Sequence, residues 1–231
     1  VATNIAVALS LLDENISVGL CDCDLYGPSI PLMFGQESAR PTATDENEII
    51  PIESHGIKLM SMGFLLDDSS PVIVRGPLAT RYTQQFLTGC LWGDLDYLVL
   101  DLPPGTGDIQ LTIAQSVSVD GAVIVTTPQE MALIDARKAA SMFAKVNVPI
   151  LGIVENMSYF LCPSDGEKYA IFGQGGGEKE SARLGVPLIG QIPIEMQTRE
   201  AGDSGNPIAL GESETAKEFK NVAEKIIASL N

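Results

Sequence analysis

The chain has 231 residues, of which 45% are hydrophobic and 6% aromatic, a composition that suits one globular domain and argues against disorder. Its 14 lysines and arginines stand against 30 aspartates and glutamates, and the formal charge of −16 argues against a nucleic-acid partner. One histidine and four scattered cysteines leave little room for a multi-histidine metal site or a disulfide framework, so the composition favours a cytoplasmic location.

Short apolar runs of strand length alternate with longer segments of helical period along the chain. The apolar opening, residues 1–12, is interpreted as a helix, and no stretch reaches the roughly 20 apolar residues that a membrane helix needs. We expect strands at residues 16–23, 96–102, 121–127, 149–156 and 187–192. Helices should begin near residues 77, 108, 128 and 177, and a last helix should span about 212–230. This alternation predicts an α/β fold in which helices cover both faces of a mostly parallel sheet.

Residues 48–62 break the alternation, because they hold two short strand-like runs around His55 and Gly56. This pattern predicts an antiparallel excursion at the sheet edge, with His55 in a solvated turn. No repeat, low-complexity linker or charge block divides the chain. Residues 1–231 are therefore interpreted as one domain.

The first strand ends in two carboxylates, Asp22 and Asp24, before the chain turns at Gly27 and Pro28. Alternation places both acids on one face of the strand, with Cys21 and Cys23 on the other. Ligands of open α/β sheets bind beyond the carboxyl ends of the strands. The acid pair is therefore either a metal or water-activating site or a cap for the turn that follows.

The second strand to end in an acid is the run from Asp96 to Asp101, which leads into a loop dense in proline and glycine. An acid that closes a buried strand before such a loop is the Walker B arrangement, in which the carboxylate serves Mg²⁺ beside nucleotide phosphates. The alternative is a helix N-cap region with Thr106 or Asp108 as the cap. That alternative explains Asp108 and leaves Asp101 unexplained.

Two further segments carry polar groups at the ends of strands. Asn156 follows the fourth strand and can offer a donor and an acceptor to a purine edge, although asparagine is also common in turns. The glycine-rich run at residues 173–177 has no Lys-Ser/Thr after it, so we expect a helix-entry loop there and not a phosphate cradle.

The strings DCDLYGPSIP, MSMGFLL, IVRGPL, DYLVLDLPPGTGD, ENMSYFLCP and IFGQGGGE occur together in one order. In this combination the chain resembles the Mrp/ApbC-type ATPases over essentially all of its length. That family comprises iron–sulfur cluster carriers of the deviant P-loop class, which also contains the MinD/ParA proteins and the nitrogenase iron protein. The resemblance implies a three-layer P-loop NTPase fold for the single domain.

The resemblance also implies roles for individual residues. Asp22 and Asp24 would lie near the attacking water and Mg²⁺, and Asp101 would be the Walker B acid that reaches Mg²⁺ through water. The loop from Pro103 through Gly105 to Gly107 would sense the γ-phosphate. The adenine would be read by Asn156, with the segment around Pro193 closing over the base. Arg75 matches a family motif without an assigned role, and a surface ion pair is the alternative.

The chain departs from the family pattern at its first residue. The deviant P-loop of the family, GKGGVGKST, should come immediately before Val1, and its glycine amides and lysines normally hold the phosphates. We therefore expect a native N-terminal strand and P-loop to be missing from the chain as given. Their loss should leave a gap in the sheet lined by apolar side chains and weaken nucleotide binding.

A second departure concerns the metal. Relatives of this type carry Cys-x-x-Cys where this chain has Cys162 and Asp165, and two subunits then offer four thiolates to one bridging [4Fe–4S] cluster. A carboxylate is a harder ligand than a thiolate, so a cluster should bind more weakly here. The other cysteines, Cys21, Cys23 and Cys90, are expected to pack in the core, with Cys90 in a helix.

The leading hypothesis is a homodimeric iron–sulfur cluster carrier with weak Mg²⁺-dependent ATPase activity, which delivers clusters to apoproteins. One alternative is a regulatory or scaffold homologue that binds nucleotide without a cluster. A second is a positioning ATPase of the MinD/ParA kind. The acidic charge and the mixed-charge last helix favour neither a nucleic-acid nor a membrane partner, so we expect none.

Overall fold

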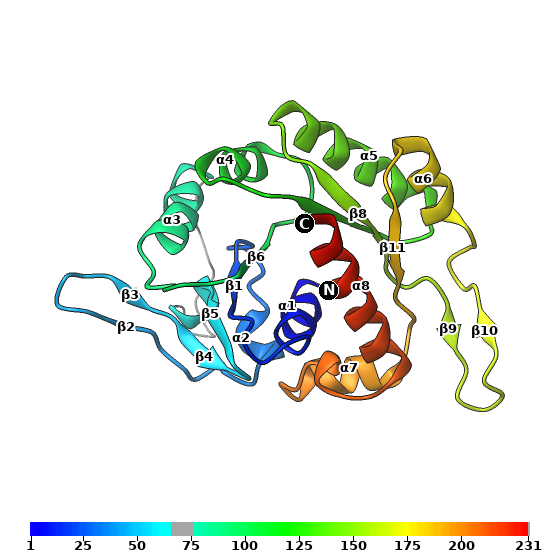
Figure 1. The fold of residues 1–231 in the computed structure, drawn as a ribbon, viewed down its shortest axis with the longest axis horizontal. Helices are drawn as coiled ribbons and strands as arrows, with labels where there is room; N and C mark the ends of the chain where they lie inside the picture. The colour runs from blue at the N-terminus through cyan, green and yellow to red at the C-terminus, as the bar shows by residue number, and fades with distance from the viewer. Residues whose placement is uncertain (66–75, 231) are drawn as a thin grey trace.

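The computed structural model describes residues 1–65 and 76–230, so Arg75 and both interpretations of it lie outside the described residues. Figure 1 shows three layers, with two β-sheets between an outer and an inner group of helices. None of the described helices is long and apolar enough to cross a membrane. The alternation of strands and helices expected from the sequence is confirmed.

The first sheet has the strand order β4-β5-β1-β6. Its central strand β1 (Val18–Asp22) pairs in parallel with β5 (Ile57–Met60) on one side and with β6 (Tyr97–Asp101) on the other. The edge strand β4 (Ile52–Ser54) runs antiparallel to β5. His55 and Gly56 join them with φ angles of 50° and 75°, the left-handed geometry of a tight hairpin turn. The expected antiparallel excursion is confirmed.

The second sheet has the order β11-β8-β7 and is entirely parallel. Its strands are β7 (Ala122–Thr126), β8 (Ile150–Glu155) and β11 (Leu188–Gln191). Two antiparallel ribbons lie outside both sheets: β2 (Thr42–Ala43) with β3 (Ile49–Ile50), and β9 (Phe160–Leu161) with β10 (Lys168–Tyr169). Both ribbons project from the body of the molecule (Figure 1).

The outer layer holds α3 (Gly76–Thr88), α4 (Asp108–Ser116), α5 (Glu130–Lys145) and α6 (Gly176–Leu184), as Figure 1 shows. The inner layer is built on α1 (Ala2–Ser10) and α8 (Glu214–Leu230), which pack against each other. The shorter α2 (Ile30–Met33) and α7 (Met196–Asp203) extend this layer. Two 3₁₀ turns, Met62–Phe64 and Ile208–Leu210, complete the described elements.

One hydrophobic cluster lies under α1 and α8 and draws on both sheets. It includes Leu20 of β1, Val154 of β8 and Ile189 of β11. A second cluster packs on the outer face of the first sheet and buries the thiols of Cys21 and Cys23, as expected. The helical placement of Cys90 is wrong, because α3 ends at Thr88 and Cys90 forms an isolated parallel bridge with Ile49.

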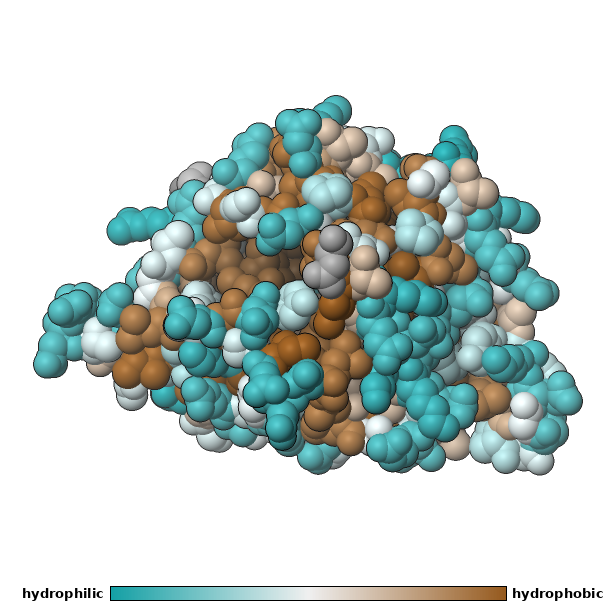
Figure 2. All heavy atoms as spheres, viewed as in Figure 1, coloured by the Kyte–Doolittle hydropathy of each residue, from teal (hydrophilic) through white to brown (hydrophobic). Residues whose placement is uncertain are grey.

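The two sheets do not join within residues 1–65 and 76–230. In this part of the chain, β6 pairs with β1 alone and β7 with β8 alone, although α4 connects these two edge strands directly. Hydrophobic side chains on them are exposed, with Leu98 of β6 at 36% and Val125 of β7 at 45%. Figure 2 shows a hollow with hydrophobic walls in the region of β6. Both β6 and β7 thus expose apolar side chains of the kind that strands buried on both faces carry.

Candidate functional site

The carboxyl ends of β1 and β6 lie side by side, with Asp22 opposite Asp101 in the strand register. The backbone N–H of Cys23 donates to the carbonyl of Asp101 at 2.9 Å, which holds the two strand ends together. Both acids therefore occupy the position at which open α/β sheets bind their ligands. The structure brings together two of the acids that the sequence singled out.

Asp22 is almost fully buried, at 2% exposure. Its carboxylate accepts hydrogen bonds from the Ser61 hydroxyl at 2.9 Å and from the backbone N–H groups of Asp24 at 3.1 Å and Ile30 at 3.4 Å. Burial raises the pKa of Asp22 to about 7, and the neighbouring Asp101 adds to the rise against these donors. Sequence reasoning missed Ser61, since it follows β5 and reaches the site only through the pairing of β5 with β1.

Asp101 is partly exposed, and burial raises the pKa of its carboxyl group above the usual range. The carboxylate of Asp24 reinforces the rise, and the backbone nitrogen of Val1 lies near enough to Asp101 to interact with it. The start of α1 therefore lies close to Asp101. The carboxylates of Asp22, Asp24 and Asp101 thus lie close together, and a bound cation would stabilise their charges.

Asp24 lies beyond the end of β1 and is partly exposed. Its carboxylate accepts hydrogen bonds from the backbone N–H groups of Tyr26 at 3.2 Å and Gly27 at 3.3 Å, as a turn cap does. Asp24 also borders a cavity of about 410 Å³ that the loop after β6 lines on its other side with Pro103 and Pro104. Asp24 therefore both shapes the turn and faces this cavity.

The loop after β6 is held by Gln110, a buried residue that the sequence analysis missed. Its Nε2 donates to the carbonyl of Pro103 at 3.1 Å and to that of Pro104 at 2.9 Å. Gly105 is exposed and has a φ of 95°, a conformation that favours glycine. Helix α4 has Gly107 and not Thr106 as its N-cap residue, while the side chain of Asp108 lies outside the described part of the structure.

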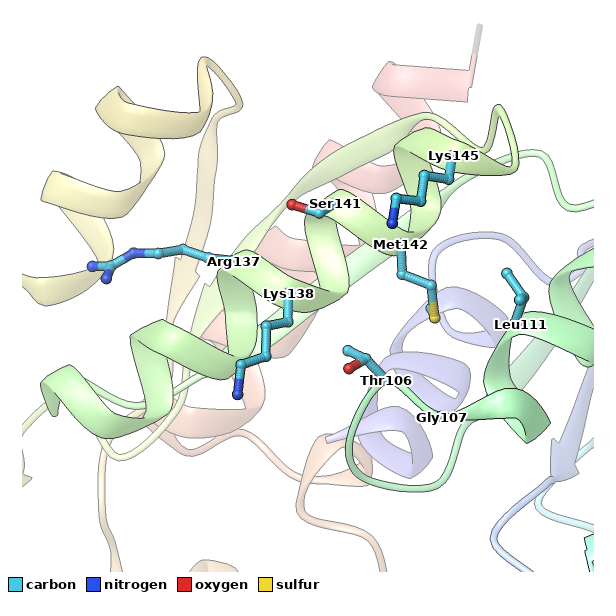
Figure 3. A pocket seen from close by; sticks show the side chains of 8 residues that line it. All are labelled: Thr106, Gly107, Leu111, Arg137, Lys138, Ser141, Met142 and Lys145. Atoms are coloured by element: carbon cyan, nitrogen blue, oxygen red, sulfur yellow. The ribbon is translucent and has the colours of Figure 1, made fainter.

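A second cavity of about 420 Å³ lies between this loop and α5 (Figure 3). Thr106 and Gly107 line it on the loop side, and Lys138 and Lys145 line it on the helix side. Arg137 points away toward α6 in Figure 3, where it forms ion pairs with Glu180 at 2.8 Å and Glu130 at 2.9 Å. The loop is therefore bordered by acids on one side and by lysines on the other.

Asn156 and Pro193 follow the ends of the neighbouring strands β8 and β11. The backbone N–H of Asn156 donates to the carbonyl of Thr126 at 2.7 Å, while its side chain has no hydrogen-bond partner among the described residues. Pro193 is buried, and Ile192 on one side of it receives a hydrogen bond from the Ser158 N–H at 2.9 Å. The two predicted base-binding residues thus lie on segments that are bonded to each other.

The β9–β10 hairpin carries Cys162 and Asp165 in the loop between its strands. The thiol of Cys162 lies 3.0 Å from the Ser164 hydroxyl. Asp165 accepts hydrogen bonds from the Glu167 N–H and the Tyr169 hydroxyl, and it also interacts with the Cys162 thiol. Together these contacts lower the pKa of Asp165. The carboxylate therefore stands next to the only cysteine of the chain that projects on a loop.

No group of three or more histidine, cysteine, aspartate or glutamate side chains is arranged to hold a metal ion within residues 1–65 and 76–230. A metal at the Asp22 and Asp101 site would therefore need ligands from water or from a bound phosphate. A cluster at Cys162 would need ligands from a second molecule.

The strand order, the acids at the ends of β1 and β6 and the proline- and glycine-rich loop define the class of P-loop NTPases. A family model described as "ParA: NUBPL iron-transfer P-loop NTPase" matches residues 1–227. The chain belongs to this family.

Curated relatives carry the name iron-sulfur cluster carrier protein. The Aquifex aeolicus protein is 49% identical over 97% of this chain and the Escherichia coli K12 protein is 48% identical over 99%. The chain spans only 62% and 63% of the length of these two relatives. It spans 78% of the Methanocaldococcus jannaschii relative, at 46% identity.

Solved structures show the same fold. A nucleotide-binding protein from Archaeoglobus fulgidus, in complex with ADP and described with cobalt, has a TM-score of 0.79 and is 37% identical. The match covers 94% of this chain and 86% of that one. The cell division ATPase MinD of Pyrococcus furiosus has a TM-score of 0.70 at 23% identity, over 98% of this chain and 91% of that one, and shares the fold.

Proposed function

We propose that this chain is part of a homodimeric, cytoplasmic, Mg²⁺-dependent ATPase that carries iron–sulfur clusters to apoproteins. The observation that carries the proposal is the acid site at the ends of β1 and β6 beside the Pro103–Gly107 loop, in a chain close to half identical to proteins named as cluster carriers. Two parts of the proposal, nucleotide hydrolysis and cluster transfer, rest on different regions of the molecule.

The chemistry of the acid site fits Mg²⁺. Carboxylate oxygens are the hard donors that this ion prefers, and it keeps several waters while bound by one or two carboxylates and by phosphates. Asp101, partly exposed and with a raised pKa, would hold it through water. The ion would neutralise charge on the phosphates during transfer.

The remaining residues of the site would position the attacking water and respond to the γ-phosphate. Asp24 borders the cavity of about 410 Å³ and would orient the attacking water there. Asp22 stays buried and accepts the Asp24 N–H, so it would hold Asp24 in place. The loop containing Pro103 and Gly105 would respond to the γ-phosphate, because Gln110 holds only its first two carbonyls and leaves its glycines free to rearrange.

The phosphate-binding loop would precede α1. The proposal is supported by the edges of β6 and β7, which have no second strand partner among the described residues, and by the position of Val1 close to Asp101. A strand between these edges followed by a glycine-rich loop would deliver backbone N–H groups to the acid site.

Isothermal titration calorimetry with ATP and Mg²⁺ tests the nucleotide part. The chain from Val1 to Asn231 is compared with the same chain preceded by its natural upstream residues. We expect the longer chain to bind ATP at least tenfold more tightly, and a Lys-to-Ala change in its P-loop to remove the gain. Equal affinity of the two chains would contradict the placement of the P-loop.

The cluster would bind between the hairpins of two subunits. Each subunit offers Cys162 and the adjacent carboxylate of Asp165, so a dimer supplies two thiolates and two oxygens. Asp165 already bonds to Glu167 and Tyr169, and these bonds would compete with ligation. We therefore propose weaker cluster binding than in a relative with Cys-x-x-Cys.

Anaerobic reconstitution with iron and sulfide tests the cluster part through visible absorbance and iron content per dimer. We expect partial loading of the natural chain, none for Cys162→Ser, and increased loading for Asp165→Cys. Failure of both the natural chain and Asp165→Cys, under conditions that load a Cys-x-x-Cys relative, would leave a nucleotide-binding regulatory or scaffold protein as the better assignment.

A further inference from the structure

Glu155 is a buried carboxylate at the end of β8, and the proposed hydrolysis does not use it. It is 1% exposed. Its Oε1 accepts hydrogen bonds from the Ser158 hydroxyl at 2.6 Å and from Nε2 of Gln191 at 3.0 Å. Its Oε2 accepts the backbone N–H of Gly177 at 2.5 Å. Both oxygens therefore accept from groups on three different segments of the chain.

No lysine or arginine among the described residues pairs with this carboxylate, and its neighbours compensate its charge in another way. Gly177 is in the first turn of α6, where the free N–H groups and the helix dipole favour an anion. A Cβ at Gly177 would lie 2.9 Å from Glu155 Oε2, and one at Gly176 would lie 2.5 Å from the carbonyl of Pro128. The glycines of residues 173–177 thus allow α6 to start against Glu155, in agreement with the expected helix-entry loop.

The same carboxylate fixes the turn that follows β8. The Ser158 hydroxyl donates to Glu155, and the Ser158 N–H donates to the carbonyl of Ile192. The Gln191 side chain also donates to the Ser158 hydroxyl at 3.2 Å. Met157, in the middle of this turn, has a φ of 54°, a left-handed value that non-glycine residues adopt at a cost. The Glu155 bonds therefore hold a strained turn in one conformation.

Asn156 is the residue of this turn with an unpartnered side chain. Its backbone is fixed by Thr126 on one side and by the bonds of Glu155 and Ser158 on the other. The segment that contains Pro193 is bonded to the same residue. The Gln191 side chain donates to the Glu155 carboxylate, and the Ile192 N–H donates to the Glu155 backbone carbonyl at 2.9 Å. The residue Glu155 thus couples both segments that the family resemblance assigns to the base.

We propose that Glu155 is a positioning residue for base recognition, which sets the preference for adenine over guanine by fixing the turn that presents Asn156. The inference rests on the proposed function, because it requires that the protein binds a purine nucleotide. The exocyclic group at position 6 of the purine is a donor in adenine and an acceptor in guanine. A turn held in one conformation presents the Asn156 amide to the base from one position, whereas a mobile turn shifts to suit either purine.

The test is the ratio of the dissociation constants for ATP and GTP, measured by calorimetry on the protein with its natural upstream residues. Glu155→Gln keeps the shape of the side chain but places an N–H₂ group against donors that the carboxylate accepted. We expect ATP affinity to fall roughly tenfold and the ATP-to-GTP preference to fall at least fivefold. Ser158→Ala, which removes one donor, should lower the preference about twofold to threefold.

Glu180→Gln is the matched control, since Glu180 is equally buried, lies on α6 and pairs with Arg137 instead of the turn. It should lower the melting temperature and leave the nucleotide preference unchanged. The double exchange Glu155→Gln with Gln191→Glu restores one carboxylate and one amide to the same place and should recover part of the preference.

The outcomes separate the inference from the proposed function. If the natural protein binds neither ATP nor GTP, the proposed nucleotide function fails and the inference fails with it. If the natural protein prefers ATP and a folded Glu155→Gln protein keeps that preference, the inference alone is overturned. Should Glu155→Gln not fold, an unchanged preference in Ser158→Ala overturns it in the same way.

Discussion

Asp22 and Glu155 are two buried acids at the carboxyl ends of parallel strands, and their surroundings differ. Asp22 lies opposite Asp101, and burial together with this second acid raises its pKa to about 7. Glu155 receives three hydrogen bonds and has no acid as a partner. Asp22 also accepts three hydrogen bonds, but they do not offset its burial and the neighbouring acid, so a cation would stabilise its charge, whereas Glu155 has no such neighbour among the described residues.

The difference corresponds to two roles at the carboxyl ends of the two sheets. Uncompensated buried acids cost stability in the free protein, and proteins keep them where a ligand or a reaction uses them. A fully bonded carboxylate holds neighbouring segments rigid and contributes to stability. Substitution at the two acids should therefore change the free energy of unfolding in opposite directions.

The largest effect is expected for Glu155→Leu. This change leaves the Ser158 hydroxyl, the Gln191 amide and the Gly177 N–H without their acceptor in a buried place, which should lower the free energy of unfolding by roughly 3–5 kcal/mol. Urea unfolding followed by circular dichroism measures it. The exposed Glu53→Leu is the control and should change stability by less than about 0.5 kcal/mol. A loss below about 1 kcal/mol at Glu155 would remove the contrast between the two acids.

Asp22→Asn should act in the other direction. A raised folded-state pKa means that ionisation of Asp22 costs stability as the pH rises from about 4 through about 7, so the cost is fully present above pH 7. Removing the charge should raise the free energy of unfolding at pH 8 by roughly 2–4 kcal/mol and abolish ATP hydrolysis. At pH 4 the two proteins should be equally stable.

Unfolding curves of the nucleotide-free and Mg²⁺-free proteins at pH 4 and pH 8 check this prediction, with the exposed Asp45→Asn as the control. A natural protein that is more stable than Asp22→Asn at pH 8 would show that Ser61 and the backbone amides fully compensate the Asp22 carboxylate. The acid site would then resemble the Glu155 side.

The sequence predicted the strands that carry Asp22 and Glu155. It did not predict the hydrogen-bond partners that make the surroundings of the two acids differ. Apolar runs located β1, β6, β7, β8 and β11, and the rule that strand ends meet at one edge brought Asp22 close to Asp101. Hydrogen-bond partners were not predictable in the same way. Ser61 is 39 residues from Asp22 and Gln191 is 36 from Glu155, and each becomes a neighbour only through strand pairing.

Secondary structure predicted from local sequence was also wrong or incomplete where tertiary contacts determine the conformation. Cys90 was expected in a helix because the segment after Pro77 has helical character, but Gly89 follows the last helical residue and the chain turns to pair with Ile49. Helix α7 was not expected, since none of its residues is buried and no apolar period marks it. The Asp165 substitution was visible in the sequence, whereas its bonds to Glu167 and Tyr169 required the hairpin.

A smaller change in the free energy of unfolding is expected at the loop that follows β6. Gln110→Ala removes the two hydrogen bonds to the carbonyls of Pro103 and Pro104, and should lower the free energy of unfolding by about 1–2 kcal/mol. Amide hydrogen exchange at Gly105, Thr106 and Gly107 should become faster. The exposed Gln115→Ala on the same helix is the control. Unchanged exchange would show that packing, and not Gln110, holds the loop.

The smallest effect is expected at the opposite ends of β1 and β6. There Asp96 accepts hydrogen bonds from the Ser17 N–H at 2.8 Å and from its hydroxyl at 2.9 Å, and these bonds lower the pKa of Asp96 from its usual range. A lowered pKa stabilises the fold above the unfolded-state pKa and loses that contribution as the pH falls. Asp96→Asn should therefore reduce the urea midpoint slightly at pH 7 and leave it unchanged near pH 2. The same strand pair carries Asp22 and Asp101 at its other end. If Asp22→Asn has the opposite pH dependence, the groups around each acid, and not the strands, decide whether its charge stabilises or destabilises the fold.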